Sequence, residues 1–521
     1  MKFNKGQILK NVGSSWFSLG VNVVVGIFLS PFILHRLGDD AFGLWILIFS
    51  VTGYYGLFDL GIRSSIVRYV AKYSATDENE ELNRLVNTAM FSYSGIGIVA
   101  MLLTLIATYF VSSIFRIPAE VLVTARWLLF MVGVSVSLGF PLGVFSGILE
   151  GLQRFYLLNF VNVTSTLLRA VLIVFALRHG GGLLTVAFIT VSLPLLNGFV
   201  NAAAVFRHVR LRLGLQHVSR ESLRRIASYS GTTFLIIVAG RLRFKTDALV
   251  IGTFVSAAAI TYFTIGSRLV DYASELVSSL AQIFVPMSSQ SHATGDLDGL
   301  RKIFVVGNRA CAFIIFPITA VLTVLGKSVI EAWVGPKYVA TSYPVMLVLL
   351  YPMTLMLAQS ASGRTLWGMA KHRTWAWVVL AEGAANLILS IALVRPYGIM
   401  GDAIGTAIPL TCSMIFFLPH HLCRLLEIKL WTYLYRAFVF PLALCVPLVA
   451  ALLLMQRWFV PHRLSQLLIQ LGIAGLVYGL GLAWAFWTNR AWDVGHLGTN
   501  RGDEVTLALV ETYRRKCDEE V

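Results

Sequence analysis

Charged residues are scarce in this sequence. Asp, Glu, Lys and Arg make up only 13% of its 521 residues, whereas soluble domains carry about 25%. Hydrophobic residues account for 57%, and the mean hydropathy is +0.75. This composition excludes an ordinary soluble domain and predicts an all-α polytopic membrane protein.

Cysteine pairs and nucleotide-binding motifs are lacking as well. The tripeptide GKS at 326–328 lacks the leading glycine of a Walker A loop. Any transport would therefore draw on a Na⁺ or H⁺ gradient, or on the gradient of the substrate itself, with no cofactor. The five cysteines form no CxxC pair and no metal-ligand spacing, so we expect small core residues at Cys311, Cys412, Cys423, Cys445 and Cys517.

Long apolar runs are abundant. A helix needs about 20 apolar residues to cross a bilayer. The first run follows a short basic N-terminus without a small-residue cleavage site, so we interpret it as a transmembrane helix rather than a removable signal. About 14 segments are long enough, at 12–34, 42–62, 87–112, 122–147, 156–177, 183–205, 230–253, 258–284, 304–325, 342–362, 375–394, 399–420, 436–456 and 466–487.

The net charge is +16, but the basic residues are spread over separate short loops. A nucleic-acid-binding domain would need a contiguous basic surface, so nucleic acid is excluded as a partner. Most of the 42 lysines and arginines fall in loops on the side that both termini share. Because cytoplasmic loops are enriched in Lys and Arg, both termini are expected in the cytoplasm.

The chain also contains an internal repeat. SATDENEELNRL (74–85) resembles HATGDLDGLRKI (292–303), which comes six predicted helices later. Such a repeat predicts two pseudo-symmetric six-helix lobes of the same orientation, with a central cavity where they meet. The predicted division is an N-lobe (1–205), a basic cytoplasmic loop (206–229), a C-lobe (230–421), two appended helices (422–488) and a cytoplasmic tail (489–521).

Three cations lie near the centre of one predicted span, in GRLRFKTDALVIGTF (240–254). Each would cost about 2.5–3.5 kcal/mol against lipid, so we expect them to face protein or water. Arg243 and Asp247 have i, i+4 spacing and are interpreted as an internal ion pair. Arg241 and Lys245 share another face. We interpret them as a cationic wall for an anionic substrate; the alternatives are acids on other helices or a shallower helix.

Other spans carry isolated charges. Arg169 is a lone cation and a second candidate for the cavity wall. Arg268 shares a helix face with Asp271 and Glu275, and this group either lines the same cavity or neutralises the preceding helix. Glu382 is an isolated acid, which is either a proton carrier or a hydrogen-bonded structural carboxylate.

Arg63 lies near the cytoplasmic end of a predicted span, where Asp59 is a possible partner. We interpret it first as a positive-inside anchor, and it is the weakest candidate for the cationic cavity.

Several segments resemble a known family. They are the basic N-terminus before the first span, LGDDAFGLW (37–45), GLFDLGIRSSIVRYVAKY (56–73), EAWVGPKY (331–338) and GIMGDAIGTAIP (398–409). From about residue 5 to 487 the chain resembles the polysaccharide transporters of the multidrug/oligosaccharidyl-lipid/polysaccharide (MOP) exporter superfamily. The resemblance implies a MATE-like fold of two six-helix lobes plus two helices. It also implies alternating access and a cationic cavity for a polyprenyl-(pyro)phosphate-linked oligosaccharide.

The same resemblance implies a flippase of the bacterial inner membrane, and not an enzyme. It serves exopolysaccharide or O-antigen-type biosynthesis, in contact with membrane lipids and with polymerase or glycosyltransferase machinery, and a monomer is favoured. Its cation site would fall on Asp247, Asn386, Ser390 and Thr406. Arg243 beside Asp247 counts against that site.

Three alternatives remain open. A multidrug or cation antiporter of the same superfamily would use an acidic cavity, which the excess of cations disfavours. A flippase for the peptidoglycan lipid precursor would share both fold and chemistry. A membrane glycosyltransferase or polymerase would need a large exterior loop or paired acids at the membrane surface, and the exterior loops here are short.

Overall fold

The structure is a computed structural model that describes residues 5–76, 78–115, 119–209, 211–226, 238, 240–243, 245–458, 461, 464–488 and 490. These residues form helices joined by short turns, and no strand occurs among them. The chain divides into two compact units. Unit 1 comprises Met1–Gly266 and Val379–Thr406, and unit 2 comprises Ser267–Val378 and Ala407–Val521. The division into lobes that the repeat suggests stays a prediction.

Unit 1 contains most of the helices of the first half of the chain. In order these are α1 (Lys5–Leu37), α2 (Asp39–Gly53), η1 (Tyr54–Asp59), α3 (Ile62–Ala75), α4 (Asn79–Ile114), η2 (Ala119–Val121), α5 (Leu122–Gly151), α6 (Phe155–Arg178), α7 (Leu183–His208), η3 (Leu215–His217) and α9 (Asp247–Phe254). The helix α10 (Ala257–Ala281) begins in unit 1 and ends in unit 2.

Unit 2 holds α11 (Phe284–Ala293), α12 (Leu297–Val334), η4 (Pro336–Tyr338), α13 (Val339–Ala358), α14 (Ser360–Gly368), η5 (Ser413–Phe417), α16 (Leu418–Leu425), α17 (Leu430–Leu434), η6 (Tyr435–Val439), α18 (Phe440–Trp458) and α19 (Leu464–Trp487). The long helix α15 (Arg373–Cys412) contributes its middle part to unit 1. Within unit 2, α12 packs against both α13 and α18.

Eleven helical segments in the described part of the chain are long and apolar enough to cross a membrane. One of them, Arg373–Leu425, has 53 residues and contains two of the predicted spans. Two other predicted spans are absent from this set: 258–284, which is α10 with its charged residues, and 230–253, which lies partly outside the described residues. The multi-pass helical fold is therefore confirmed, whereas the count of fourteen is not.

Large apolar side chains cover much of the surface, as a membrane protein requires. Phe28, Tyr109, Phe175 and Leu476 are each more than 60% exposed. In water such surfaces would drive aggregation, but hydrocarbon solvates them. Of the cysteines, Cys311, Cys423 and Cys445 are buried as expected, but Cys412 is exposed, because a small apolar thiol can also face lipid. Cys517 lies outside the described residues.

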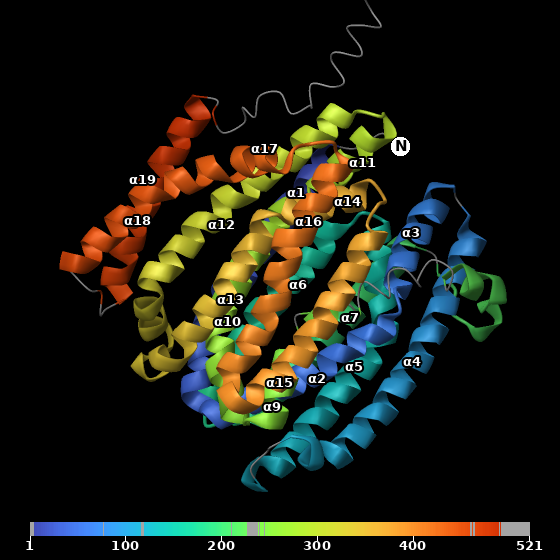
Figure 1. Cartoon of the computed structure of the whole chain (residues 1–521). Helices are drawn as coiled ribbons and strands as arrows, with labels where there is room; N and C mark the ends of the chain where they lie inside the picture. Colours follow the sequence, from blue (N-terminus) through green and yellow to red (C-terminus); the bar gives the residue numbers. More distant parts are fainter. Residues whose placement is uncertain are drawn as a thin grey trace, which may run out of the picture. The chain divides into compact units, whose positions relative to one another are not determined.

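Small residues let the helices of unit 1 approach closely. The helices α4 and α5 lie side by side (Figure 1). A Cβ at Gly97 would lie 2.5 Å from the carbonyl oxygen of Ser137, and one at Gly133 would lie 2.3 Å from the side chain of Thr104. Helices in membranes associate mainly through such close packing, because lipid offers no hydrophobic drive between them.

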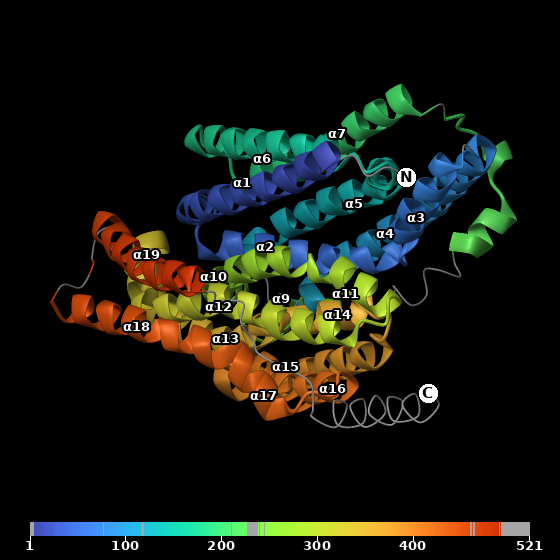
Figure 2. The same cartoon turned by 90° about the horizontal axis from the view of Figure 1, so that it is seen from above.

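Polar side chains join α1 to α6, which run alongside each other (Figure 2). Thr166 on α6 donates to the amide oxygen of Asn22 on α1 over 2.9 Å. Two turns away, Asn159 donates to the hydroxyls of Ser14 and Ser15. These hydrogen bonds fix the register between two helices that are otherwise mainly apolar.

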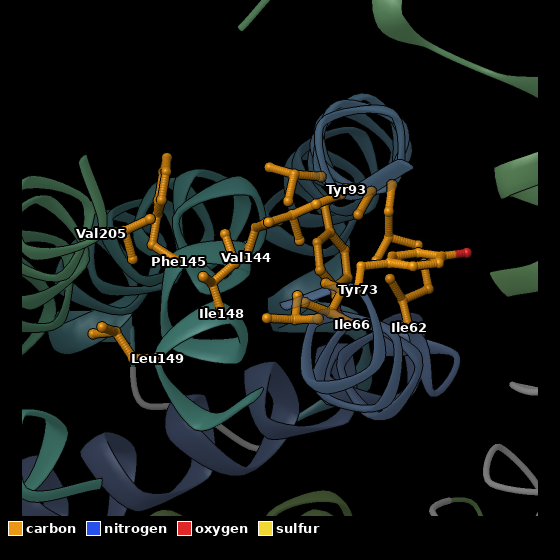
Figure 3. Close-up of a cluster of buried hydrophobic side chains, with 14 of the residues drawn as sticks. Ile62, Ile66, Tyr73, Tyr93, Val144, Phe145, Ile148, Leu149 and Val205 are labelled. Atoms are coloured by element: carbon orange, nitrogen blue, oxygen red, sulfur yellow. The ribbon is translucent and has the colours of Figure 1, made fainter. Parts of the chain in front are cut away.

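One hydrophobic core of unit 1 lies where α3, α4, α5 and α7 meet. Figure 3 shows side chains that these helices contribute to the core: Ile62, Ile66, Tyr73, Tyr93, Val144, Phe145, Ile148, Leu149 and Val205. Each of them is less than 9% exposed. Arg63 lies on α3, next to the core residue Ile62, and Asp59 precedes that helix. The packing of α3 in the core therefore fixes the backbone position of Arg63.

Candidate functional site

Four oxygen-bearing side chains of unit 1 meet in one place. Asp247 is the first residue of α9, while Asn386, Ser390 and Thr406 all lie on α15. We call these four the oxygen cluster. The sequence resemblance assigned these residues to a cation site, and the structure brings them within hydrogen-bonding distance of one another.

A reversal of the chain inside α15 makes this meeting possible. Gly398 has φ +57° and ψ −141°, which breaks the helix between residues 373–397 and 399–412. Glycine adopts such a conformation without the penalty that a Cβ would impose. Asn386 and Ser390 lie one turn apart before this break, and Thr406 lies after it, so the two arms of α15 bring them together.

Two glycines allow the arms of α15 to touch. A Cβ at Gly401 would lie 2.0 Å from the carbonyl oxygen of Leu393. A Cβ at Gly405 would lie 2.5 Å from Oγ of Ser390. Their i, i+4 spacing forms a stripe of small residues, along which the opposite backbone packs directly.

Hydrogen bonds connect every member of the oxygen cluster. Thr406 Oγ1 lies 3.2 Å from Oδ1 of Asp247 and 3.1 Å from Oδ1 of Asn386, and its hydroxyl proton can serve either acceptor. Ser390 Oγ donates to the same amide oxygen of Asn386 over 2.9 Å. The amide nitrogen of Asn386 donates to the backbone carbonyl of Arg243 over 3.0 Å. The cluster is thus one network tied to the helix that carries the cations.

This network is sheltered from solvent. Ser390 is fully buried, Asn386 is 2% exposed and Thr406 is 8% exposed. Buried hydroxyl and amide oxygens beside the carboxylate of the half-buried Asp247 suit a hard cation, which takes oxygen ligands. A group of three or more His, Cys, Asp or Glu side chains that would hold a metal ion is absent from the described residues.

A further acid was missed by sequence reasoning. Asp402 lies on the second arm of α15, one turn before Thr406, and is fully buried. Its backbone carbonyl accepts from Ser390 Oγ over 3.3 Å, and its carboxyl group lies within electrostatic range of Asp247. The i, i+4 spacing to Thr406 in GIMGDAIGTAIP was a signal that could have revealed it.

Arg243 and Glu382 form a buried ion pair beside the oxygen cluster. The guanidinium Nε of Arg243 contacts Oε1 of Glu382, and each residue is only 6% exposed. Glu382 lies on α15 one turn before Asn386. Glu382 thus has a cationic partner. The pairing of Arg243 with Asp247 stays a prediction, as does a proton-carrying role for Glu382.

The predicted cationic wall consists of Arg241 and Lys245. The backbone nitrogen of Lys245 donates to the carbonyl of Arg241 over 3.0 Å, so the two residues lie one helical turn apart as expected. The guanidinium of Arg241 is close to Gly56, where a Cβ would lie 2.9 Å from Nη2. Tyr54 lies within electrostatic range of both Arg241 and Asp247. Arg241 is half-buried, and Lys245 is exposed.

The remaining cationic candidates have separate surroundings. Arg63 donates through Nη2 to Glu150 over 2.5 Å, and its backbone nitrogen lies 3.4 Å from Asp59, whose carboxylate also accepts from Tyr93. Arg63 is thus bound at the start of α3, as an anchor would be.

Arg169 is half-buried on α6. Arg268 lies over the ring of Tyr272, 5.3 Å from its centroid, and it belongs to unit 2, whereas the other cationic candidates belong to unit 1. A chamber that all these cations share stays a prediction.

The fold, with its long apolar helices, defines a multi-pass membrane protein. Residues 8–292 match the family described as "Polysaccharide biosynthesis protein". This match covers more than half of the chain, and the protein belongs to that family. The MOP-like fold class predicted from the sequence is confirmed by solved structures that share the fold.

Two relatives and one solved structure illustrate the likeness. "Uncharacterized membrane protein EpsK" of Bacillus subtilis is 22% identical over 82% of this chain and 85% of its own length. "Putative O-antigen transporter" of Shigella flexneri is 18% identical over 81% of this chain and all of its own length. A solved structure, "Lipid II flippase MurJ, inward closed conformation", has a TM-score of 0.71 with 15% identity, covering 92% of this chain and 99% of that chain.

Proposed function

We propose that this protein is a flippase, and not an enzyme, that moves a polyprenyl-(pyro)phosphate-linked oligosaccharide from the cytoplasmic to the outer leaflet. The head group of such a lipid carries charges and many hydroxyls, which cannot cross hydrocarbon unaided. Membership of the polysaccharide biosynthesis family and the likeness to a protein named as an O-antigen transporter support this substrate class. The product would feed exopolysaccharide or O-antigen-type synthesis in the bacterial inner membrane.

The observation that carries the proposal is which charged groups surround Arg241. This cation sits in a segment predicted to span the membrane, and among the described residues no carboxylate lies within ion-pair distance of it. A buried or lipid-facing cation without an anion is costly. A phosphate would supply the missing anion, because a guanidinium binds phosphate oxygens in a bidentate manner.

Lys245 and Arg169 are proposed to extend the same phosphate-binding surface, with Arg268 and Arg63 at its margins. Lys245 is exposed one turn from Arg241, so it can reach a second phosphate oxygen. The lipid tail would stay in the bilayer, while the two lobes expose the head group to one side of the membrane and then to the other. Release requires that no single contact bind the phosphate too tightly.

We further propose that the oxygen cluster binds the cation whose gradient drives transport. Asp247 supplies the anionic ligand, and Asn386, Ser390 and Thr406 supply neutral oxygens. A hydroxyl that now donates within the network can turn its hydrogen away and offer a lone pair. Because Glu382 is bound to Arg243, we assign Glu382 to charge balance rather than to the ligand set.

The proposal is tested by transport in proteoliposomes. The full-length chain is purified and reconstituted with a polyprenyl-pyrophosphate-linked oligosaccharide that carries a dithionite-sensitive fluorophore on its sugar. Protein-free vesicles lose about half of the fluorescence, because dithionite reaches only the outer leaflet. We expect the wild-type protein to expose the inner pool as well. Arg241→Ala should slow this phase about tenfold or more, the loss of at least about 1.4 kcal/mol of interaction.

Lys302→Ala is the matched control, because Lys302 is an exposed basic residue on α12 outside the cationic wall. Its rate should equal that of the wild type at equal protein content. Absence of flipping by the wild-type protein would refute the function. Wild-type rates for Arg241→Ala, Lys245→Ala and Arg169→Ala alike would refute the phosphate-binding residues while leaving the function intact.

A further inference from the structure

Asp402 has a buried carboxyl group that takes no part in the hydrogen bonds of the oxygen cluster. The residue is 0% exposed, and among the described residues neither carboxylate oxygen has a hydrogen-bond partner. A buried carboxyl group without a hydrogen-bond partner is unfavourable in a protein interior, whether it is neutral or ionised. Such a group persists where it serves a ligand that is bound for part of the time.

The surroundings of Asp402 point to the oxygen cluster. Asp402 contributes its backbone carbonyl to Ser390 Oγ over 3.3 Å, and its carboxyl group lies within electrostatic range of Asp247 across the network. Thr406, one turn further along the same arm, lies 3.2 Å from Asp247. Two carboxylates from different helices therefore flank the same amide and hydroxyl oxygens.

Arg243, the cation next to this network, already has an anionic partner. Arg243 offers its backbone carbonyl to Asn386, while its guanidinium contacts Glu382. Glu382 and Arg243 thus form a pair of their own, and the carboxyl group of Asp402 is left available for another partner. A metal cation with oxygen ligands would meet this need, because carboxylate, amide and hydroxyl oxygens are the ligands of hard cations.

We propose that the side chain of Asp402 is a ligand of the coupling cation and acts as a second anionic ligand opposite Asp247. The inference rests on the proposed cation coupling and adds to it a residue that the family resemblance does not assign. With Asp402 the site offers two carboxylates, one amide oxygen and two hydroxyls. This ligand set takes a hard cation such as Na⁺ or Ca²⁺, and it disfavours the larger and more weakly bound K⁺.

The role predicts an unusual combination of effects for Asp402→Asn. The substitution keeps the shape of the side chain but removes its charge, so it should weaken cation binding. It should not lower the stability of the cation-free protein, because the wild-type carboxylate has no hydrogen bond there to lose. A carboxylate with a structural role would behave in the opposite way: its removal would lower Tm in every buffer.

The experiment measures Tm of the purified full-length protein in nanodiscs as NaCl, CaCl₂ or KCl replaces choline chloride at constant ionic strength. A cation that binds only the folded state raises Tm in a concentration-dependent manner. We expect a rise with NaCl or CaCl₂ for the wild type, and the two titrations decide which cation the site prefers. For Asp402→Asn the concentration for half of the effect should increase about tenfold or more. Asp40→Asn, at an exposed position on α2, is the matched control and should keep the wild-type response.

The outcomes separate the two proposals. A wild-type response that Asp247→Asn abolishes and Asp402→Asn retains would overturn the role of Asp402 and leave the cation site standing. A wild-type protein whose Tm is the same in choline, sodium and calcium would overturn both. If Asp402→Asn does not yield folded protein, the role is overturned as well, since the substitution is expected to leave the cation-free fold intact. Equilibrium binding of radioactive ²²Na⁺ or ⁴⁵Ca²⁺ to the same variants provides the second measurement.

Discussion

A Cβ on Gly405 would lie 2.5 Å from Oγ of Ser390 and 2.6 Å from its backbone nitrogen. Both distances are shorter than any van der Waals contact, and the backbone atom cannot turn away as a side chain can. The two arms of α15 can therefore make this contact because residue 405, like Gly401, has no side chain. This contact also places Ser390 against Asp402.

Gly405→Ala should separate the arms of α15. Overpacking of this kind costs about 1–3 kcal/mol, and we expect a lower Tm together with a weaker cation response. The matched control is Gly472→Ala on α19, where nothing lies within 4 Å of the added methyl group. Because alanine is about 0.5–1 kcal/mol better than glycine inside a helix, that variant should be as stable as the wild type or more so. Equal Tm values for the two variants would show that the arms are not in contact.

Removal of one partner of the buried ion pair should be strongly destabilising. Arg243→Met leaves Glu382 charged in an apolar setting, which costs about 3–5 kcal/mol. Replacement of both, Arg243→Met with Glu382→Leu, should recover most of the stability, because two apolar groups need no counter-ion. Tm measurements on both single variants and the double variant form the cycle.

An exposed ion pair provides the comparison for this cycle. Arg84 and Glu81 lie 3.2 Å apart on α4, and their side chains are 49% and 27% exposed. Arg84→Ala should cost less than about 1 kcal/mol, because water screens the pair. Strict additivity of the Arg243 and Glu382 substitutions would mean that their contact contributes nothing to stability.

Gly56→Ala is expected to displace Arg241 without unfolding the protein. The added methyl group would lie 2.9 Å from Nη2 of Arg241, and the long side chain can move to avoid it. Stability should change little, whereas flipping should fall about tenfold if the guanidinium loses about 1.4 kcal/mol of phosphate binding. Gly53→Ala is the matched control, since its methyl group would lie at an ordinary 3.8 Å from Nη1. Wild-type flipping by Gly56→Ala would argue against a phosphate contact at Arg241.

The fold class could be predicted because hydropathy is a direct physical requirement of a bilayer. Every long apolar run inside the described residues is helical, including the pair of runs joined at Gly398. The count of spans was harder to predict. Charges in α10 reduce its apolar character, so composition alone does not separate a cavity-lining span from a helix outside the membrane.

The site was predicted in part. The oxygen cluster came from resemblance, and its residues do meet. The partner of Arg243 could not be read from spacing, because Glu382 belongs to a helix much later in the chain. The spacing of residues in the sequence predicts neighbours on one helix, such as Arg243 and Asp247, but it does not predict contacts between helices. Asp402 was missed for the same reason: its burial depends on the reversal at Gly398, which brings its arm against that of Ser390.

The direction of transport depends on the orientation of the chain, which the distribution of basic residues predicts. The loop around η3 is rich in arginine, with Arg207, Arg212, Arg220 and Arg224 nearby, whereas the turn at Gly180 has only Arg178. Green fluorescent protein fused after residue 216 should fluoresce, because it folds in the cytoplasm. Alkaline phosphatase fused after residue 180 should be active, because it matures only outside. The reverse pattern would invert every span, place the proposed cytoplasmic entry of the substrate on the outer side, and contradict the positive-inside assignment.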